Sequence, residues 1–468
     1  MSSATPPDPI ASSLEESASI PKTGLIVPRA GKVGWVRWSI GFLLFFAVLI
    51  NYIDRSSMSV AEHDMRLEFG LTEGQIGIIL GSFGWSYALM QIPMGMLLDK
   101  IGIKWVMRAA TTLWAISCFL TAMISGMGLL LVARLILGLA EAPIFPGAMK
   151  VTSYWFPRSE RGMATVIFDS GQRLSNVIGF PIVGAAVALF GWRGAFITIG
   201  VLSLIYTAVF FFRYRDPKEM NRRGKLSDAE LDHILSGGAQ HEDAPRPNPL
   251  ANIGYILRQR KVWGMSLGLG CAGYVQWMLL TWLPGFLQSQ MHMDVAKSGL
   301  FTAIPWLFAV IVQYLLPGFW LDRLIRNGKS STTVRRVFII SGMLLATTIV
   351  GTAFTQDLVW SLVWITLGTT GITIAFSVTN SLPALIAPEG AVGATGAVMN
   401  TVNNLIGTTA PIVTGFIVQL TGSFAWAFIV AGIMLVIGIF FYVVVLGRIE
   451  QIPTEAERAA AKSAGVNG

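Results

Sequence analysis

The stretch Trp38–Arg55, WSIGFLLFFAVLINYIDR, sets an aspartate and an arginine directly after sixteen residues that carry no charged side chain. A run of this length and apolarity is typical of a membrane-spanning helix. Asp54 and Arg55 are costly there, because insertion of a charged group at the helix centre costs about 2.5–3.5 kcal/mol. Such groups usually line the interior of a helix bundle or a water-filled cavity. The alternative is a charge pair that extends to the membrane surface.

The whole chain of 468 residues has the composition of a membrane protein. Hydrophobic residues make up 53% of it and charged residues 13%, whereas soluble domains carry about 25% charged residues. The net charge of +8 does not indicate nucleic-acid binding, because Lys and Arg occur mainly in short runs between apolar segments. Cys118 and Cys271 lie within apolar segments, so we expect them to be packing residues.

Apolar runs of about 20 residues predict an all-α membrane protein with twelve transmembrane helices in two pseudo-symmetric six-helix bundles. The first six spans are expected near 36–58, 74–98, 104–125, 129–153, 162–189 and 193–212. The second six are expected near 262–288, 297–321, 336–355, 358–379, 390–419 and 424–446. The resulting domains are a disordered cytosolic tail (1–35), an N-terminal bundle (36–213), a cytoplasmic linker (214–261), a C-terminal bundle (262–447) and a second cytosolic tail (448–468).

Loop sequences add orientation and local structure. If the N-terminus is cytoplasmic, only Arg66, Arg193 and Lys297 fall on the outer side, and the other loop Lys and Arg fall inside. This asymmetry predicts a multi-pass protein of the cell (inner) membrane with both termini in the cytoplasm. Within the linker, Ser227–Glu230 is typical of a capping box, which predicts a short surface helix.

A short motif occurs once in each half of the chain. Gly95–Lys104 places an aspartate four residues after a glycine, followed by a basic residue, and Gly318–Arg323 repeats that spacing. Such a repeat implies two related bundles with a site between them near the membrane midplane. The first motif resembles the signature loop of the major facilitator superfamily.

Four further motifs resemble the anion:cation symporter branch of that superfamily. They are Asn51–Arg55, Gly84–Tyr87, Arg134–Pro143 and Trp155–Gly162. The branch holds proton-coupled transporters of sugar acids (galactonate, glucarate, hexuronate) and other organic anions. The resemblance covers residues 36–447 and implies a small organic anion as the partner, protons as the coupling ion and no cofactor. We expect a monomer in the lipid bilayer, with no nucleic-acid partner.

No predicted span of the C-terminal half contains an interior Asp, Glu, Lys or Arg, whereas spans of the N-terminal half contain acids and arginines that could share a cavity. They are Asp54, Arg55, Arg134, Glu141, Asp169 and Arg173. These three acids and three arginines balance, so a bound anion would leave an uncompensated charge unless a carboxylate took up a proton. Arg134 and Glu141 are seven residues apart and therefore share a helix face, whereas Asp169 and Arg173 can pair at i,i+4. A Glu141–Arg134 ion pair that only holds helices together is the alternative.

The expected roles follow from depth and from the resemblance. Glu141 lies near the middle of its span, where burial favours the neutral carboxyl, and the resemblance implies that Asp54 and Glu141 carry protons. It also implies that Arg55 and Gln172 bind the substrate carboxylate. Further candidate substrate-binding residues are Tyr52, Tyr87, Arg134, Arg173, Tyr274, Asn400 and Asn404. Packing is the alternative for the aromatic ones.

A second set of residues is expected to form gates or structural contacts. It comprises Gly95, Asp99, Lys100, Asp322, Arg323 and Asp169. Gly95 would allow close helix approach, and Asp99 would cap a helix N-terminus or meet Arg158 or Arg161.

The segment Asp169–Arg173, DSGQR, departs from the sugar-acid transporters that the chain resembles. Those have Asn-Ser-Ala-Gln followed by a non-basic residue. The extra acid–base pair is either internal, or Arg173 binds a second carboxylate, which makes a diacid or an aromatic acid a plausible substrate.

The sequence therefore predicts import of an organic anion, a sugar acid or related carboxylate, by proton symport and alternating access. The alternatives are an anion exchanger without obligatory proton coupling and a non-transporting membrane sensor of the same fold. An enzyme is not expected, because the sequence contains no nucleophile triad, phosphate-binding loop or metal-ligand cluster.

Overall fold

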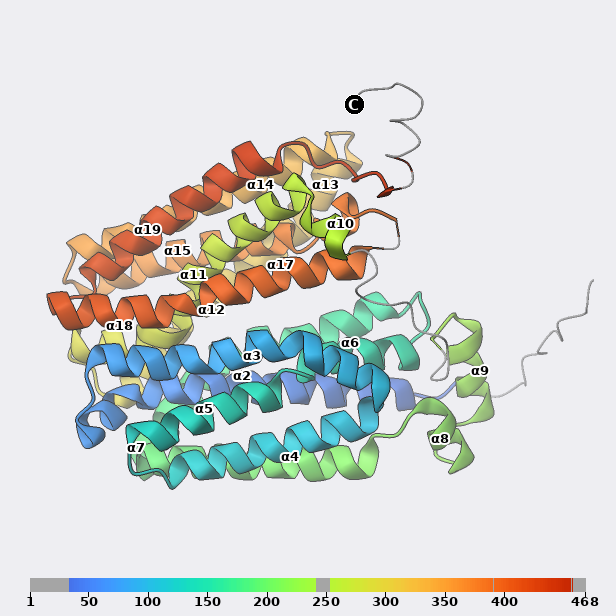
Figure 1. Ribbon diagram of the computed structural model, residues 1–468, viewed down its shortest axis with the longest axis horizontal. Helices are drawn as coiled ribbons and strands as arrows, with labels where there is room; N and C mark the ends of the chain where they lie inside the picture. Colours follow the sequence, from blue (N-terminus) through green and yellow to red (C-terminus); the bar gives the residue numbers. More distant parts are fainter. Residues whose placement is uncertain (1–32, 241–252, 390, 456, 458–468) are drawn as a thin grey trace, which may run out of the picture.

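Two bundles of helices lie side by side in the computed structural model, one formed by α2–α9 and the other by α10–α19 (Figure 1). The structure describes residues 33–240, 253–389, 391–455 and 457, and within them every regular element is helical. Most of the tail predicted at 1–35 and the end of the tail predicted at 448–468 lie outside the described residues.

The N-terminal bundle follows the predicted spans, and α2 and α3 are longer than expected. Its elements are α2 (Val36–Phe69), α3 (Glu73–Lys100), α4 (Ile103–Ala122), α5 (Met127–Glu141), α6 (Ile144–Trp155), α7 (Arg161–Arg213), α8 (Pro217–Arg222) and α9 (Asp228–Ser236). The span predicted at 129–153 is divided between α5 and α6 around Pro143. The spans predicted at 162–189 and 193–212 form the single element α7, which breaks at Gly191 with a φ of 68°.

The C-terminal bundle repeats this pattern. Its α-helices are α10 (Ile253–Leu257), α11 (Arg260–Ser289), α12 (Val295–Gln313), α13 (Leu321–Arg326), α14 (Ser331–Ala346), α15 (Leu358–Thr379), α16 (Pro383–Ile386), α17 (Val392–Gly407), α18 (Thr409–Thr421) and α19 (Ala425–Phe440). Short segments of other helix types extend α12, α14 and α19, at Tyr314–Trp320, Thr347–Phe354 and Phe441–Leu446. The span predicted at 390–419 is divided between α17 and α18 at Thr408.

The length of α2 changes the position of the opening motif. The first span was expected to end near residue 58, but α2 continues to Phe69 and ends where Gly70 adopts a left-handed conformation and donates its N–H to the Arg66 carbonyl oxygen. Asp54 and Arg55 therefore lie in the middle of a 34-residue helix. The side chain of Asp54 is fully buried, so the alternative of a surface charge pair is wrong.

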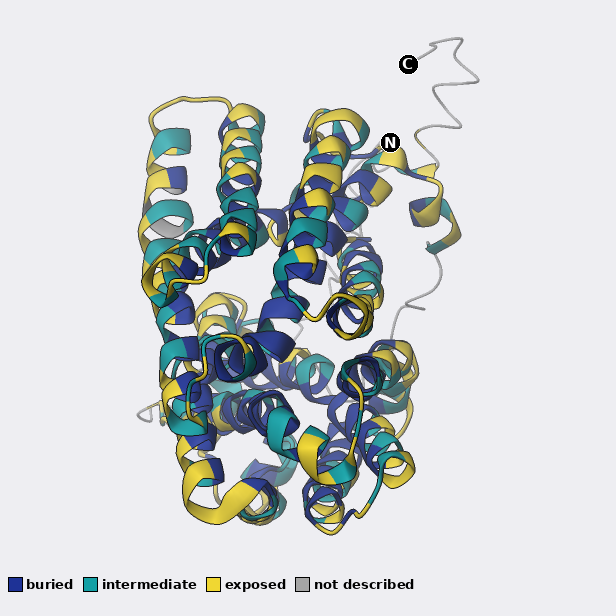
Figure 2. Cartoon of the chain, turned by 90° about the vertical axis from the view of Figure 1, so that its left-hand side faces the viewer, coloured by how far each residue is buried: buried dark blue, intermediate teal, exposed yellow. Residues whose placement is uncertain are grey.

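The outer surface of the bundles is apolar. Nine stretches of the described residues are long and apolar enough to cross a membrane by length and composition. Many large hydrophobic side chains are exposed on them, among them Phe42, Phe46 and Leu420. Exposed positions lie mainly on outward-facing sides of the helices, and buried ones lie where helices face one another (Figure 2). A contiguous apolar exterior of this kind is suited to lipid, so the chain is an all-helical, multi-pass membrane protein.

The two bundles meet closely near one end of the molecule. We call the end that carries α8 and α9 the terminal end, and the end where α2 connects to α3 and α18 connects to α19 the loop end (Figure 1). Near the loop end, α3 packs on α18 so tightly that a Cβ on Gly77 would lie 2.6 Å from the Pro411 carbonyl oxygen. On the other flank, α12 packs on α7 with comparable closeness at Gly299.

A polar cluster fastens the linker to the terminal end of the N-terminal bundle. Ser227 accepts the backbone N–H of Glu230 and thus begins α9, as predicted. The Glu230 carboxylate does not complete the capping box, because it accepts hydrogen bonds from Arg37. Arg37 also pairs with Glu160 at 2.7 Å, and this hydrogen bond holds the pKa of the Glu160 carboxyl below its ordinary value.

Candidate functional site

Asp54 lies at the centre of the N-terminal bundle and is held there by α4. Its Oδ2 accepts the indole N–H of Trp114 at 2.6 Å and the thiol of Cys118 at 3.2 Å. Its Oδ1 is buried and has no hydrogen-bond partner among the described residues. Cys118 is therefore more than the packing residue that the sequence predicted. A buried carboxylate with one free oxygen is well suited to take up a proton.

Arg55, the next residue on α2, joins three helices. Its Nε donates to Glu141 Oε2 on α5 at 3.0 Å. Its guanidinium carbon lies 4.3 Å from the ring centroid of Tyr52, 4.5 Å from that of Tyr87 and 4.9 Å from that of Phe83. Aromatic faces stabilise a cation and restrict its orientation. The three rings and Glu141 therefore hold the Arg55 guanidinium in one orientation.

Glu141 ends α5 and is fully buried. Its Oε1 has no hydrogen-bond partner among the described residues, so only the oxygen facing Arg55 is satisfied. An anion that took over the Arg55 guanidinium would leave the Glu141 carboxylate buried without its cation. Loss of a buried partner costs several kcal/mol unless the remaining group becomes neutral. An anion bound to Arg55 in place of Glu141 would therefore favour the neutral form of the Glu141 carboxyl.

Arg134 lies on the same face of α5 as Glu141, as predicted, but forms no ion pair with it within the described residues. Its guanidinium carbon lies 5.0 Å from the Phe83 ring centroid. Its Nε and Nη1 are buried without hydrogen-bond partners in the described part of the chain, and it interacts electrostatically with both Asp54 and Glu141. The expected alternative of a Glu141–Arg134 pair is therefore not what the structure shows, because Arg55 takes that place.

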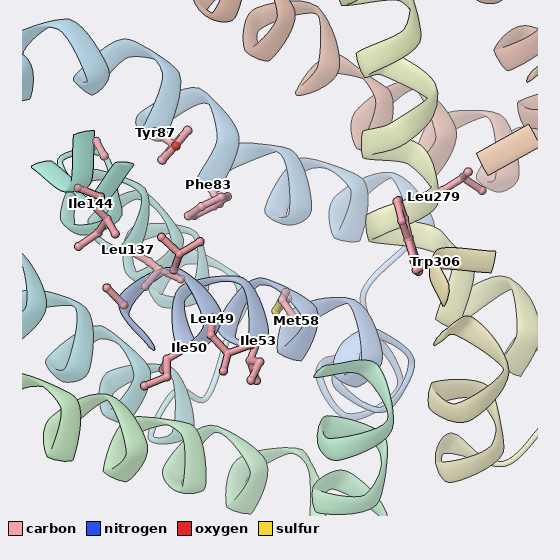
Figure 3. Close-up of a cluster of buried hydrophobic side chains, with 14 of the residues drawn as sticks. Leu49, Ile50, Ile53, Met58, Phe83, Tyr87, Leu137, Ile144, Leu279 and Trp306 are labelled. Atoms are coloured by element: carbon pink, nitrogen blue, oxygen red, sulfur yellow. The ribbon is translucent and has the colours of Figure 1, made fainter. Parts of the chain in front are cut away.

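Apolar packing fixes the walls of this site. Phe83 and Tyr87 project from α3, and Leu49, Ile50 and Ile53 belong to the same stretch of α2 as Asp54 (Figure 3). The Phe83 and Tyr87 rings stack with centroids 5.8 Å apart. The sequence predicted Tyr52 and Tyr87 as site residues but missed Phe83, Trp114 and Cys118. No spacing pattern relates them to Asp54 of α2, since Phe83 lies on α3 and Trp114 and Cys118 lie on α4.

Asp169 and Arg173 pair within α7, which their i,i+4 spacing allows. Arg173 donates from Nε at 3.1 Å and from Nη2 at 2.6 Å to the same carboxylate oxygen. Both side chains line a cavity of about 300 Å³ between α7 and the C-terminal bundle, together with Gln313, Tyr314, Arg335 and Ser377. Arg335 belongs to the start of α14, and its buried Nε has no partner among the described residues. This cavity therefore has two arginines and one acid.

The C-terminal bundle contributes neutral groups. Asn404 donates to Asn400 Oδ1 at 3.4 Å, and Asn400 donates to Gln91 Oε1 of α3 at 3.4 Å, which links the bundles. The shared face predicted for the two asparagines is thus confirmed. Tyr274 is buried in the apolar core, and Gln172 is partly buried on α7.

The gate residues are arranged differently from the expectation. Asp99 pairs with Lys150 of α6 at 2.5 Å rather than with Arg158 or Arg161, because Lys150 also caps the end of α3 by donating to the Leu98 carbonyl oxygen. A Cβ on Gly95 would meet nothing within 4 Å, so the close helix approach expected there is not made.

The remaining predicted gate residues lie at the surface or outside the description. Lys100 is exposed at the end of α3, and Arg323 is exposed on α13. The side chain of Asp322 lies outside the described part of the structure. Within the described residues no group of three His, Cys, Asp or Glu side chains could hold a metal ion.

Comparisons with known proteins add a context to this geometry. The family model of the Major Facilitator Superfamily matches residues 44–411. The chain is 39% identical over 427 residues to the uncharacterized transporter YybO of Bacillus subtilis (strain 168), which covers 91% of this chain and 97% of that protein. It is 32% identical over 431 residues to the probable L-galactonate transporter of Escherichia coli (strain K12). That alignment covers 91% of this chain and 92% of the transporter.

Among solved structures, the chain is similar to a bacterial homologue of the human lysosomal transporter Spinster in an inward-facing, unoccupied conformation. The match covers 87% of this chain and 96% of that chain, with a TM-score of 0.69 and 18% identity. At this identity the likeness concerns the fold alone.

Proposed function

We propose a function for this chain on the premise that it belongs to the anion:cation symporter branch of the Major Facilitator Superfamily and is a transporter rather than an enzyme. In this proposal it imports an organic anion together with protons. The observation that carries the proposal is the buried Arg55–Glu141 pair with its one unsatisfied carboxylate oxygen. An incoming carboxylate competes for Arg55, and protonation of Glu141 removes the charge that this competition would strand.

The architecture proposed for this activity has twelve membrane crossings. The 53 residues of α7 have a combined helix length of about 80 Å at 1.5 Å per residue. This is enough for two crossings of a hydrocarbon core about 30 Å thick, and the break at Gly191 separates the two crossings. The terminal end, which carries most of the loop Lys and Arg, faces the cytoplasm. Tight packing near the loop end and the cavity lined by Arg173 support an inward-facing state in an alternating-access cycle.

The charges argue for a coupling ion. Moving a monoanion into an inside-negative cell costs about 2.3 kcal/mol per 100 mV, so accumulation requires a co-transported cation. Asp54 and Glu141 are both fully buried, and each has an oxygen without a hydrogen-bond partner among the residues that the structure describes. They are the proton sites of this proposal, with Arg55 as the ligand of the substrate carboxylate and Asn400 and Asn404 as ligands of its hydroxyl groups.

The substrate class proposed is a sugar acid or a related carboxylate. The relative from Escherichia coli is named for L-galactonate, a polyhydroxylated monoacid. One cation in an aromatic cage and a pair of asparagines on the opposite bundle suit a molecule with a carboxylate at one end and hydroxyl groups along its length.

The test is uptake of radiolabelled L-galactonate by proteoliposomes with the membrane potential clamped and a pH gradient imposed. Accumulation that follows the gradient and collapses with a protonophore supports proton symport. Counterflow without accumulation in any gradient would instead indicate an exchanger. Binding without flux would indicate a sensor of the same fold.

Arg173 provides a prediction about substrate selectivity. D-galactonate and galactarate share a six-carbon skeleton and differ at one terminal carbon, which is a hydroxymethyl group in the first and a carboxylate in the second. If Arg173 binds a second carboxylate, Arg173→Gln is expected to weaken the binding of galactarate about tenfold or more and to change the binding of galactonate little. The reason is that a charge-assisted hydrogen bond contributes about 1.5–3 kcal/mol.

Competition of both acids against labelled substrate measures this difference. Arg335→Gln, on the opposite wall of the cavity, is the matched variant that shows whether the effect is specific to Arg173. Equal losses for the two acids would mean that the Asp169–Arg173 pair is structural.

A further inference from the structure

Glu62 is a buried carboxylate that lies apart from the cluster around Arg55. It is 3% exposed, and its Oε2 has no hydrogen-bond partner among the described residues. Eight residues separate it from Asp54 on α2, which corresponds to about 12 Å toward the loop end. The sequence analysis missed it because the first span was expected to end near residue 58.

Glu62 lies where α2 of one bundle meets α11 of the other. A Cβ on Gly285 would collide with Glu62 Oε1, so the carboxylate rests directly against the α11 backbone. One turn earlier, the Ser59 hydroxyl donates to the Thr281 carbonyl oxygen at 2.7 Å. One turn later, Gln288 donates to the Val60 carbonyl oxygen at 3.3 Å. These contacts form the loop-end gate, defined here as the seam of α2 residues 59–62 with α11 residues 281–288.

The charges around the loop-end gate do not compensate Glu62. On α2 the following ionisable residues are His63, Asp64, Arg66 and Glu68. Arg66 is paired with Glu73 at the start of α3, at 3.3 Å. Residues 281–290 of α11 contain no ionisable side chain. The cations on α12 and α7 near this end are in pairs of their own, Lys297 with Asp294 and Arg193 with Glu68.

An ionised carboxylate in this position would be buried without a partner, which costs several kcal/mol, whereas a neutral carboxyl costs far less. Once the bundles separate at the loop end, water reaches the carboxylate and it can ionise near its ordinary pKa of about 4.3. We propose that Glu62 is a proton-binding site of the loop-end gate, neutral when the gate is closed and ionised when it is open.

The proton balance separates Glu62 from the coupling residues. The carboxylate takes a proton from the solution at the loop end as the gate closes and returns it to the same solution when the gate opens. This proton does not cross the membrane, so it changes the gate equilibrium and not the transport stoichiometry. The inference rests on the alternating opening of the two bundles in the proposed function, but not on any substrate or on coupling through Glu141.

The closed gate binds one more proton than the open gate, so rising pH favours opening. Above about pH 5 the ratio of open to closed gates is expected to rise by up to about tenfold per pH unit. The experiment measures spin-label distances in the full-length protein in nanodiscs, with labels on Leu67→Cys and Gln290→Cys. Both positions are exposed near the loop end, whereas Cys118 and Cys271 are buried.

The parent for this measurement carries Asp54→Asn and Glu141→Gln, so that the proposed coupling carboxylates cannot contribute. Between pH 5 and 8 the long-distance population is expected to grow in the parent and to stay constant after Glu62→Gln. Glu68→Gln, a carboxamide at an exposed carboxylate of the same end, is the control and should behave as the parent. A parent without pH dependence, or a pH dependence that survives Glu62→Gln, would overturn the proposal.

Gly285→Ala gives a second, independent result. The added methyl group occupies the space of the carboxylate, so the gate is expected to stay open at every pH, and adding Glu62→Ala should restore closure. A Gly285→Ala variant that closes like its parent would count against the seam described here. Because no transport is measured, a failure of galactonate uptake in proteoliposomes leaves these outcomes unaffected.

Discussion

Replacing Arg55 by lysine is expected to weaken L-galactonate binding about 10- to 100-fold, the equivalent of the 1.5–3 kcal/mol that a hydrogen bond to a charged group contributes. Lysine keeps the charge but loses the planar guanidinium that lies between the rings of Tyr52 and Tyr87. An ammonium group cannot contact Glu141 and a substrate carboxylate with the same fixed geometry. Isothermal titration of the purified protein at one fixed pH measures the change.

Arg193→Lys is the matched control for this substitution. Arg193 pairs with Glu68 at the loop end, where its side chain is 41% exposed, and it is remote from the Arg55 cluster. The Arg193→Lys variant should therefore bind L-galactonate with unchanged affinity. If Arg55→Lys binds as tightly as the unmodified protein, Arg55 does not recognise the carboxylate.

Replacing Glu141 by glutamine is expected to abolish accumulation driven by a pH gradient while exchange of substrate across the membrane continues. With one proton per monoanion, each unit of pH gradient accumulates substrate about tenfold, and the variant should show none of this gain. The carboxamide oxygen can still accept the Arg55 hydrogen bond, so the site keeps its shape. The side chain can no longer exchange a proton with the solution.

Two assays on the same proteoliposomes check this expectation. Uptake under a clamped potential measures accumulation, and counterflow measures exchange. Glu68→Gln removes a carboxylate that is 42% exposed, and exposed ion pairs contribute only about 0–1 kcal/mol, so this control should accumulate substrate normally. Gradient-dependent accumulation in Glu141→Gln would assign the coupling proton to another group.

Much of the fold could be predicted from apolar periodicity, because a membrane-spanning helix must satisfy its backbone hydrogen bonds internally and must be apolar over a set length. The ends of the helices could be predicted less well from the sequence. The extension of α2 beyond residue 58 places polar residues such as Glu62 and His63 inside the helix, and the Glu62 carboxylate is buried against α11. An apolar run in the sequence indicates a surface that faces lipid. A helix that lies between two bundles has little surface of this kind, so its full length is not visible as an apolar run.

The sequence by itself determined which residues could do chemistry. Every acid and arginine expected within the spans of the N-terminal half was visible as a charge in an apolar run, and their cost in hydrocarbon already indicated a shared polar interior. The i,i+4 spacing was enough to predict the Asp169–Arg173 pair, since both partners lie on one helix.

Only the tertiary structure decided which partner each group takes. Glu141 is paired with Arg55 of α2 rather than with Arg134 of its own helix, and Asp54 is held by Trp114 and Cys118 of α4. These contacts join residues 60 or more positions apart, and no local spacing encodes them. The physical reason is that burial makes each carboxylate compete for the few donors in reach, and the packing of helices determines which donors those are.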